Sequence, residues 1–384
     1  MEEKKYLFTS ESVTEGHPDK VADKISDSIL DAYLSSDPNS HVACETVVTK
    51  DLVFVMGEIK SKASVDIDKV VRDSVNEIGY NKPGLGFDCN TLTILNKLSE
   101  QSPDINMGVE NDLGAGDQGM MFGYACRDTK EFMPAPVMYS HKIVEALSKY
   151  RKDHPEVGLR PDGKAQVTVE YIGNKVNRID NIVVSAQHAE NVSRESIKKI
   201  VIDKIVKKVI PSELLRDTKY YFNPTGRFCV GGPAGDSGLT GRKIIVDTYG
   251  GYARIGGGAF SGKDPSKVDR SGAYMARYIA KNIVASGICD KIEIGLSYAI
   301  GKKHPTSIMV ETYNTSKYKD SEIIKMILQL FPLTPKGMIE KLNLRKPIYA
   351  KTTNYGHFSG KDLSWEKTNM INEIIEYFNE SSNN

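Results

Sequence analysis

Apolar and polar residues alternate with two different periods in the first quarter of the chain. Between Val21 and Tyr33, apolar residues repeat at helical spacing, which predicts a helix ending near Asp37 and Pro38. Two segments with strand-like alternation follow, VACETVV and LVFVMGEI, and a short polar turn between them predicts a β-hairpin. The segment VDIDKVVRDSVNEIGY then predicts a second helix. The order of elements is helix, hairpin, helix.

The same order of elements recurs twice further along the chain. Its second copy reads SHKIVEALSKYRKD, AQVTVEY, IDNIVVSAQHA and RESIKKIVIDKIVKKVI, and its third reads YMARYIAKNIVASG, IEIGLSYAIG, SIMVETYN and SEIIKMILQLF. One predicted strand of each copy carries a central glutamate, at Glu45, Glu170 and Glu311, and these lie about one domain length apart. The repetition predicts three similar α/β domains.

The strand pattern also indicates the fold class. A strand such as VTVEY, at residues 167–171, buries one face and exposes the other, as in antiparallel sheets. We therefore expect helices to cover one face of each sheet, with the domains packed together through the rest. The predicted class is α+β rather than a doubly wound parallel sheet.

Composition and charge limit the classes of partner. The 51 basic and 50 acidic residues nearly cancel, to a formal charge of +1, so we expect neither a nucleic-acid partner nor an anionic membrane. No stretch approaches the roughly 18 apolar residues of a membrane helix, and no targeting segment is expected. The five cysteines never form a CxxC pair. We therefore expect no zinc site and no disulfide framework, which favours a cytoplasmic protein.

The segment from Asn223 to Asp269 has a different composition from its surroundings. It is rich in glycine, and its only predicted strand is KIIVDTY. Glycine lets backbone amides converge on an anion, and long loops of this kind are usually functional. The cations of this segment include Arg227, Arg242, Lys243, Lys263 and Lys267. The pattern predicts a polyphosphate site, although the glycines could also form simple turns with the cations facing water.

One part of this segment matches the spacing of a P-loop. Residues 257–263 read GGAFSGK, which satisfies GxxxxGK. The next residue is Asp264, whereas a P-loop has Ser or Thr there to hold magnesium, and the preceding residues are further glycines rather than a strand. A P-loop ATPase or kinase is therefore the weaker alternative.

Two aspartates and one histidine are candidate partners of the phosphate cations. Asp19 and Asp269 each come just before a predicted helix, where a carboxylate can hold magnesium if phosphate oxygens complete the coordination shell. The other interpretation of such an aspartate is a helix N-cap. His17 lies on a turn between Gly16 and Pro18, where it could donate a hydrogen bond to a leaving oxygen.

Three long motifs make the sequence resemble the S-adenosylmethionine synthetases, or methionine adenosyltransferases. They are GHPDKV at residues 16–21, GAGDQG at 114–119 and GGGAFSGKD at 256–264, within a resemblance that runs from about Phe8 to about Trp365. The resemblance implies three related domains about a pseudo-threefold axis, at residues 4–102, 115–229 and 231–371, with a mobile gating loop at 101–114. It also implies a homodimer with active sites shared between subunits, often paired into a tetramer.

The resemblance implies a reaction between ATP and L-methionine. The methionine sulfur attacks ribose C5′ and expels triphosphate, which is hydrolysed to pyrophosphate and phosphate before release. Cations aimed at the departing triphosphate stabilise the transition state more than the ground state. A neutral thioether needs no general base, so no catalytic triad is expected. The implied cofactors are two magnesium ions and one potassium ion per site.

Matching the motifs one position at a time assigns roles to individual residues. The implied catalytic residues are His17, Lys164, Arg242 and Lys263. Magnesium is assigned to Asp19 and Asp269, and potassium to Glu45. The implied ATP contacts are His17, Asp162, Gly163, Lys164, Arg227, Phe228, Asp236, Arg242, Lys243, Ala259 and Lys263. The implied methionine contacts are Glu58, Gln101, Asp117, Asp236 and Lys267.

The sequence departs from the family pattern at a few places. Ser237 stands where many bacterial relatives carry cysteine, and Ile255 stands where histidine is common. The gating loop looks some residues shorter than in certain relatives. A second hypothesis is an inert regulatory subunit that binds the same ligands. Such a subunit would be expected to lack some of the phosphate and magnesium residues, and all of them are present.

Overall fold

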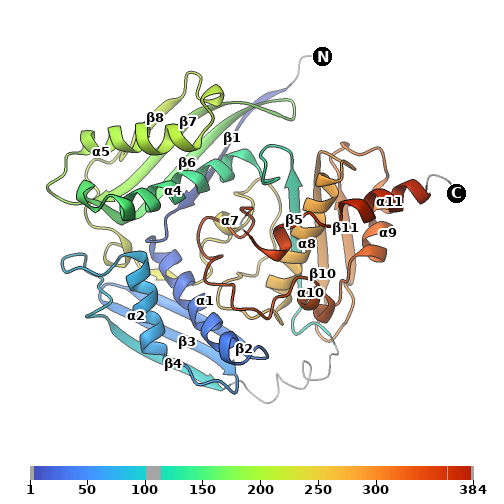
Figure 1. Cartoon of the computed structure of the whole chain (residues 1–384), viewed down its shortest axis with the longest axis horizontal. Helices are drawn as coiled ribbons and strands as arrows, with labels where there is room; N and C mark the ends of the chain where they lie inside the picture. The colour runs from blue at the N-terminus through green and yellow to red at the C-terminus, as the bar shows by residue number, and fades with distance from the viewer. Residues whose placement is uncertain (1–3, 101–113, 361, 382–384) are drawn as a thin grey trace.

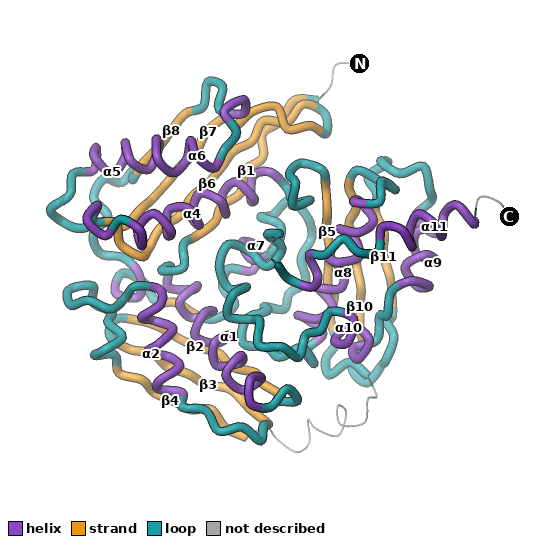
Figure 2. The backbone as a smooth tube through the Cα atoms, in the orientation of Figure 1, coloured by secondary structure: helices purple, strands orange, loops and turns teal. Residues whose placement is uncertain are grey.

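Three β-sheets with helices packed against them surround a central region of loops (Figures 1 and 2). The structure is a computed structural model that describes residues 4–100, 114–360 and 362–381. The strand orders of the three sheets are β4-β3-β2-β9, β1-β6-β7-β8 and β11-β10-β5. This arrangement confirms the α+β class.

The N-terminal sheet contains the first predicted hairpin. Strands β2 and β3 pair antiparallel from His41↔Lys60 to Thr49↔Leu52, and β4 runs parallel to β3. Alternate residues of β2 are buried beneath α1, so this sheet has one covered face, as expected. The elements are α1 (Pro18–Ser36), β2 (His41–Thr49), β3 (Leu52–Lys60), α2 (Ile67–Ile78), β4 (Thr93–Glu100) and β9 (Gly238–Leu239).

The central sheet contains the second predicted hairpin. Strands β6 and β7 pair antiparallel across the turn at Gly173 and Asn174, and α4 packs against β6 and β1. The helix predicted over residues 194–210 is present, but its middle is wound as a π-helix. The elements are β1 (Lys5–Val13), α4 (Ala135–Asp153), β6 (Leu159–Ile172), β7 (Lys175–His188), α5 (Arg194–Ile200), the π-helix η2 (Val201–Val206), α6 (Lys207–Val209) and β8 (Lys219–Phe222).

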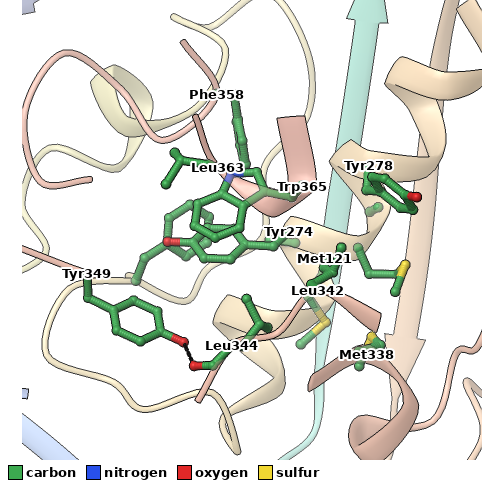
Figure 3. Close-up of a cluster of buried hydrophobic side chains, with 14 of the residues drawn as sticks. Met121, Tyr274, Tyr278, Met338, Leu342, Leu344, Tyr349, Phe358, Leu363 and Trp365 are labelled. Carbon is green, nitrogen blue, oxygen red and sulfur yellow. Dashed lines mark hydrogen bonds between the residues drawn. The ribbon is translucent and has the colours of Figure 1, made fainter. Parts of the chain in front are cut away.

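The C-terminal sheet carries the third predicted hairpin and an aromatic core. Tyr274 of α8 stacks on Trp365 with ring centroids 3.8 Å apart, and both side chains are buried (Figure 3). This cluster fixes the chain segment 342–365 against α8. The elements are β5 (Gly119–Cys126), α8 (Val268–Ala285), β10 (Lys291–Tyr298), β11 (Ser307–Glu311), α9 (Asp320–Leu330), α10 (Pro335–Lys341) and α11 (Ile371–Ser381).

Each sheet is completed by a strand from another third of the chain. The N-terminal strand β1 pairs with β6 of the central sheet, and β5 pairs with β10 of the C-terminal sheet. The short strand β9, which follows the central sheet in sequence, pairs with β2 of the N-terminal sheet. The strands are thus exchanged in a cycle, and no sheet is built from one continuous segment.

One expectation about a single element is wrong, and two further features differ among the three copies. The segment KIIVDTY forms the short helix α7 (Ile244–Asp247) rather than a strand, because its Asp247 carboxylate turns inward to the buried Lys20. Glu311 ends the second strand of its hairpin, as its place in the sequence predicts, whereas Glu45 and Glu170 lie on the first. Strand β10 is buried on both faces, since Arg254 covers its Glu293.

Two observations bear on the compartment and membrane expectations. Across the described part of the chain, the helices are too short or too polar to cross a bilayer. All five cysteines are free thiols and buried, in agreement with the expected absence of a disulfide framework.

Candidate active site

Two glycine-rich loops lie against the same edge of strand β2. The first glycine loop (residues 236–243) contains β9, which pairs with Val47 and Val48. The second glycine loop (residues 256–264) joins the other end of the strand, where the Cys44 amide donates to the Gly262 carbonyl at 2.9 Å. Both loops therefore have a fixed position relative to β2 and to each other.

Two glycines permit this close approach. A Cβ at Gly238 would overlap the Pro18 carbonyl at the start of α1. Gly262 has a φ of 82°, in the left-handed region, and a Cβ there would overlap the Cys44 carbonyl. The glycines therefore bring the loop backbones against α1 and β2.

Asp19 is the centre of the first group of charged residues. It lies in the first turn of α1 and is buried. Its Oδ1 accepts from the Leu239 amide at 3.0 Å, and its Oδ2 lies 2.5 Å from Lys243 Nζ. The Arg242 guanidinium lies 3.7 Å from Oδ1. Although burial opposes ionisation, the Lys243 and Leu239 contacts lower the pKa of Asp19.

His17 caps α1 beside this group. Its Nδ1 accepts from the Asp19 amide at 3.2 Å, so the ring is held in one orientation. Burial is the main cause that lowers the pKa of His17, and Lys243 and Lys164 add to it, while Asp19 opposes them, with a resulting value of about 4. At neutral pH the imidazole is uncharged and can donate only through Nε2.

Lys263 and Asp269 form the second group of charged residues. Lys263 Nζ lies 2.6 Å from Asp269 Oδ2, and Asp269 stands in the first turn of α8. A Cβ at Gly258 would overlap this carboxylate, so the second glycine loop wraps closely around it. Lys267 binds Asp264 at 2.6 Å instead of pointing freely into the site.

One pocket adjoins the second group. Its lining includes Ile244 and Asp247 of α7, Gly256 and Gly258 of the second glycine loop, and Asp269. Ile255 also lines it and packs against the core. Asp19, Arg242 and Lys243 of the first group do not line this pocket, so the two groups are joined through the contact between Gly241 and Ala259 of the two glycine loops.

The residues predicted to contact the nucleotide fall into two kinds of environment. Asp162 is buried and accepts from the Gly232 amide at 2.8 Å, and burial raises its pKa to about 6. Gly163 is buried in β6, where its carbonyl accepts from the Thr14 amide. Three others are more accessible: Lys164 pairs with Glu11 at 2.6 Å, Arg227 with Glu190 at 3.3 Å, and Asp236 caps the Ser237 amide at 2.9 Å.

Two predicted nucleotide contacts and one departure from the family pattern remain. Ala259 packs against Gly241, so it joins the two glycine loops directly. Phe228 is half-buried and pairs with His188 through its backbone. The departure Ser237 donates from its hydroxyl to Thr49, the last residue of β2, at 3.2 Å.

Two of the predicted potassium and methionine residues lie on the open face of the N-terminal sheet. Glu45 and Glu58 are exposed on neighbouring strands, where Glu58 is opposite Ala43, two positions from Glu45. Ala43 also bridges to Lys263. Asp117 is exposed just before β5. Gln101 and residues 101–113 of the predicted gating loop lie outside the described residues.

The P-loop alternative does not agree with the structure. Asp264 is buried, accepts from the Val42 amide at 2.7 Å, and holds the end of the second glycine loop on β2. The loop runs from α7 to α8 and does not connect a parallel strand to a helix. The resemblance of GGAFSGK to a P-loop is therefore one of spacing only.

A row of aspartates on α1 is not among the residues predicted from the sequence. Asp23, Asp27 and Asp31 follow Asp19 at intervals of four residues, and all three point into the protein. Asp23 accepts from the Gly241 amide and Asp27 from the Gly262 amide, both at 2.8 Å. The signal that could have found them is the repeat of one residue type on the helix face that packs inward.

The donor set is compatible with magnesium held jointly by protein and phosphate. Within residues 4–100, 114–360 and 362–381, no three His, Cys, Asp or Glu side chains are grouped to hold a metal by themselves. Asp19 and Asp269 each supply one carboxylate beside a lysine that is predicted to bind phosphate. Magnesium commonly binds through one or two carboxylates plus substrate phosphates.

Comparison with known proteins identifies the family over nearly the whole chain. Residues 5–103, 112–228 and 230–367 match the N-terminal, central and C-terminal domains of S-adenosylmethionine synthetase, respectively. The chain is 56% identical over 383 residues to the S-adenosylmethionine synthase of Wolinella succinogenes, covering 98% of this chain and 99% of that protein. It is also 56% identical to the enzymes of that name from Clostridium tetani and Clostridium botulinum, covering 96% and 97% of this chain and 98% and 100% of theirs. The chain belongs to the S-adenosylmethionine synthetase family.

Proposed function

We propose that this protein is a methionine adenosyltransferase that forms S-adenosylmethionine from ATP and L-methionine. The observation that carries the proposal is the convergence of Arg242, Lys243 and Lys263 with Asp19 and Asp269 along one edge of β2. Such a set of cations fits a triphosphate, and no other described group of cations is held by two glycine loops.

The lysines and the arginine act by electrostatic stabilisation. As the bond from ribose C5′ to oxygen breaks, negative charge builds on the triphosphate oxygen, and fixed cations lower the energy of that state. His17 is held by its cap on α1, so its Nε2 can donate a hydrogen bond to that oxygen. The methionine sulfur is a neutral nucleophile and leaves no proton to remove. The chain therefore contributes orientation and charge rather than a general base.

Metal ions complete this charge distribution. The family is metal-dependent. We assign magnesium to Asp19 and Asp269, two ions per site, because each carboxylate can bind a metal once phosphate oxygens reach the site. We assign one potassium ion to Glu45, whose exposed carboxylate lies on β2 between the two places where the glycine loops bind. Bound magnesium would neutralise the charge of the triphosphate.

A second subunit would complete the methionine side of the site. Glu58 and Asp117, assigned to methionine, are exposed at the sheets rather than enclosed. Strands of all three sheets expose large apolar side chains, among them Leu7, Leu95, Met120 and Tyr221. Such apolar exposure favours contact with another protein surface. We therefore assign a homodimer with shared sites, which could pair into a tetramer, and a cytoplasmic location.

A product assay tests the proposed function. Purified protein is incubated with ATP, magnesium and potassium, with and without L-methionine, and the products are separated by mass spectrometry. We expect S-adenosylmethionine, pyrophosphate and phosphate only when methionine is present. Release of ADP, or phosphate release that does not depend on methionine, would indicate an ATPase or kinase. Binding of both substrates without product would indicate the inert regulatory subunit.

A further inference from the structure

Helix α1 presents four aspartates to the backbone of the C-terminal third of the chain. They are spaced four residues apart and so lie along one face of the helix. Each accepts from at least one main-chain amide at 2.8 to 3.0 Å: Leu239 to Asp19, Gly241 to Asp23, Gly262 to Asp27, and Tyr349 and Ala350 to Asp31. We call this set the aspartate row.

Burial of the aspartate row costs free energy, which indicates that its contacts have a role in the protein. Like charges four residues apart destabilise a helix, and buried carboxylates need partners. Asp23 is paired with the fully buried Lys20 at 3.0 Å, and Lys20 also binds Asp247. Asp27 is paired with the fully buried Arg270 at 2.7 Å. The two central carboxylates are thus fixed by cations that do not reach the active site.

The two central aspartates hold the two glycine loops. The amide bound by Asp23 lies two residues before Lys243, and the amide bound by Asp27 lies one residue before Lys263. Successive members of the row are about 6 Å apart along the helix axis, from the rise of 1.5 Å per residue. The loops also meet each other directly, since Gly241 packs against Ala259. One rigid helix therefore determines the separation of the two loops.

We propose that Asp23 and Asp27 are positioning residues that set the spacing between the phosphate cations of the first and second glycine loops. The inference rests on the proposed function, because it concerns the use of Arg242, Lys243 and Lys263 on a triphosphate. Neither aspartate touches substrate. Each acts through the backbone of the loop it binds.

Asp23 is the better residue for a test. Removal of Asp27 would leave Arg270 buried without a counter-charge, whereas removal of Asp23 leaves Lys20 paired with Asp247. The matched control is Asp31, which belongs to the same row and binds backbone amides in the same way. Its partners, Tyr349 and Ala350, lie outside both glycine loops.

The experiment compares Asp23→Ala, Asp23→Asn and Asp31→Ala in steady-state kinetics and amide hydrogen exchange. We expect Asp23→Ala to lower kcat by roughly 10²-fold and to leave KM for methionine little changed. In other enzymes, a displacement of active-site groups by about 1 Å lowers the rate to this extent. Asp23→Asn should regain at least part of this loss, because its amide oxygen can still accept from Gly241. Asp31→Ala should change kcat by less than about twofold, because the partners of Asp31 lie outside both glycine loops and the loop cations should keep their positions. Exchange should increase at residues 239–243 in the first variant and at 349–350 in the control.

Several outcomes would overturn the inference. Equal kcat in Asp23→Ala and Asp31→Ala would show that the row only stabilises the fold. Faster exchange at residues 239–243 without loss of kcat would show that loop position is unimportant for the reaction. If Asp23→Ala does not fold, Asp23→Leu against Asp31→Leu makes the same comparison, because leucine fills the space of the aspartate side chain but cannot accept from the loop amide. Wild-type protein without methionine-dependent product would overturn the proposed function and this inference with it, whereas active wild type with equal variants overturns the inference alone.

Discussion

Lys243 Nζ lies 2.5 Å from Asp19 Oδ2, so a cation assigned to phosphate is paired with a carboxylate assigned to magnesium. Lys263 and Asp269 repeat this relationship at 2.6 Å. Both pairs are partly shielded from solvent, and each prevents an isolated charge at the site. When a magnesium triphosphate binds, each carboxylate can exchange its lysine for metal and each lysine its carboxylate for phosphate, so the charges stay balanced.

The first prediction concerns His17 and the two half-reactions. His17→Asn keeps a helix N-cap, because asparagine also accepts from the amide of α1, but it removes the donor near the leaving oxygen. We expect adenosyl transfer to fall by roughly 10²–10³-fold, as at comparable sites, and hydrolysis of added triphosphate to fall much less. Rapid-quench measurement of each step separates the two. An equal loss in both steps would contradict the role assigned to His17.

The second prediction concerns potassium. Glu45→Gln removes an exposed carboxylate without disturbing the buried face of β2. The variant should keep the rate that the wild type shows without potassium and should no longer respond to added potassium. Activity is measured over a potassium titration with sodium as the control ion. If the response to potassium persists, the ion binds elsewhere, and a lower melting temperature alone would indicate that Glu45 forms an ordinary salt bridge between domains.

The third prediction concerns shared sites. Glu58→Gln and Lys263→Ala chains should each be inactive alone, because each chain lacks a residue assigned to the site. Glu58 and Lys263 flank Ala43 of the same chain, so rescue requires that a site takes one of them from each subunit. Mixed dimers would contain one intact site and one site with both defects. At random assortment about half of the dimers are mixed, so roughly a quarter of wild-type activity should return. Subunit exchange is verified by mass spectrometry. No rescue after verified exchange would place each complete site within one chain.

The fourth prediction concerns pH and Asp31. Burial raises the pKa of Asp31 to about 6, above its ordinary value of 3.8. The folded protein therefore binds more protons than the unfolded chain between these values, and this carboxylate lowers stability as pH rises through 6. From pH 4 to 7, the free energy of unfolding of Asp31→Asn should gain up to about 3 kcal/mol relative to wild type. Urea unfolding of the variant and the wild type at several pH values measures this change in the free energy of unfolding.

The exposed Asp51→Asn is the matched control for Asp31. It also replaces an aspartate with asparagine, and asparagine tolerates the left-handed conformation of this turn residue. Asp51→Asn is measured over the same pH range as the reference for this substitution at the surface. A difference in unfolding free energy between Asp31→Asn and wild type that does not change with pH would show that the folded protein does not perturb the Asp31 carboxyl.

The fifth prediction concerns a buried charge network in the C-terminal core. Glu366 is buried and binds both Arg277 and Lys281, at 2.8 and 2.7 Å. Glu366→Gln leaves two buried cations without a counter-charge, which costs about 3–5 kcal/mol in comparable sites. The exposed Glu376→Gln should change the unfolding free energy by less than about 0.5 kcal/mol. Chemical unfolding measures the free energy of unfolding of both variants. Similar free energies for the two variants would mean that the network is not needed for stability.

Local patterns predicted the hairpins and helices, and motifs predicted the charged residues that meet at β2. Alternation of apolar and polar residues predicts a strand such as β2, because the buried face of the strand carries the apolar residues and the open face carries the polar ones. The same reasoning mistook residues 243–249 for a strand, since Ile244, Ile245 and Val246 are β-branched. Their helical conformation depends on Lys20, which is far away in sequence. In the sequence of an amphipathic helix, a buried lysine cannot be distinguished from a lysine that is exposed to solvent.

The cyclic exchange of strands makes the three thirds of the chain dependent on one another during synthesis. The central sheet has all of its strands only when residue 222 has emerged, although its first strand is made at residue 5. The N-terminal sheet waits longer, because β9 is made after the whole central sheet. The first glycine loop is the segment that closes this sheet. A nascent chain therefore cannot finish its first sheet before it has made part of the proposed active site.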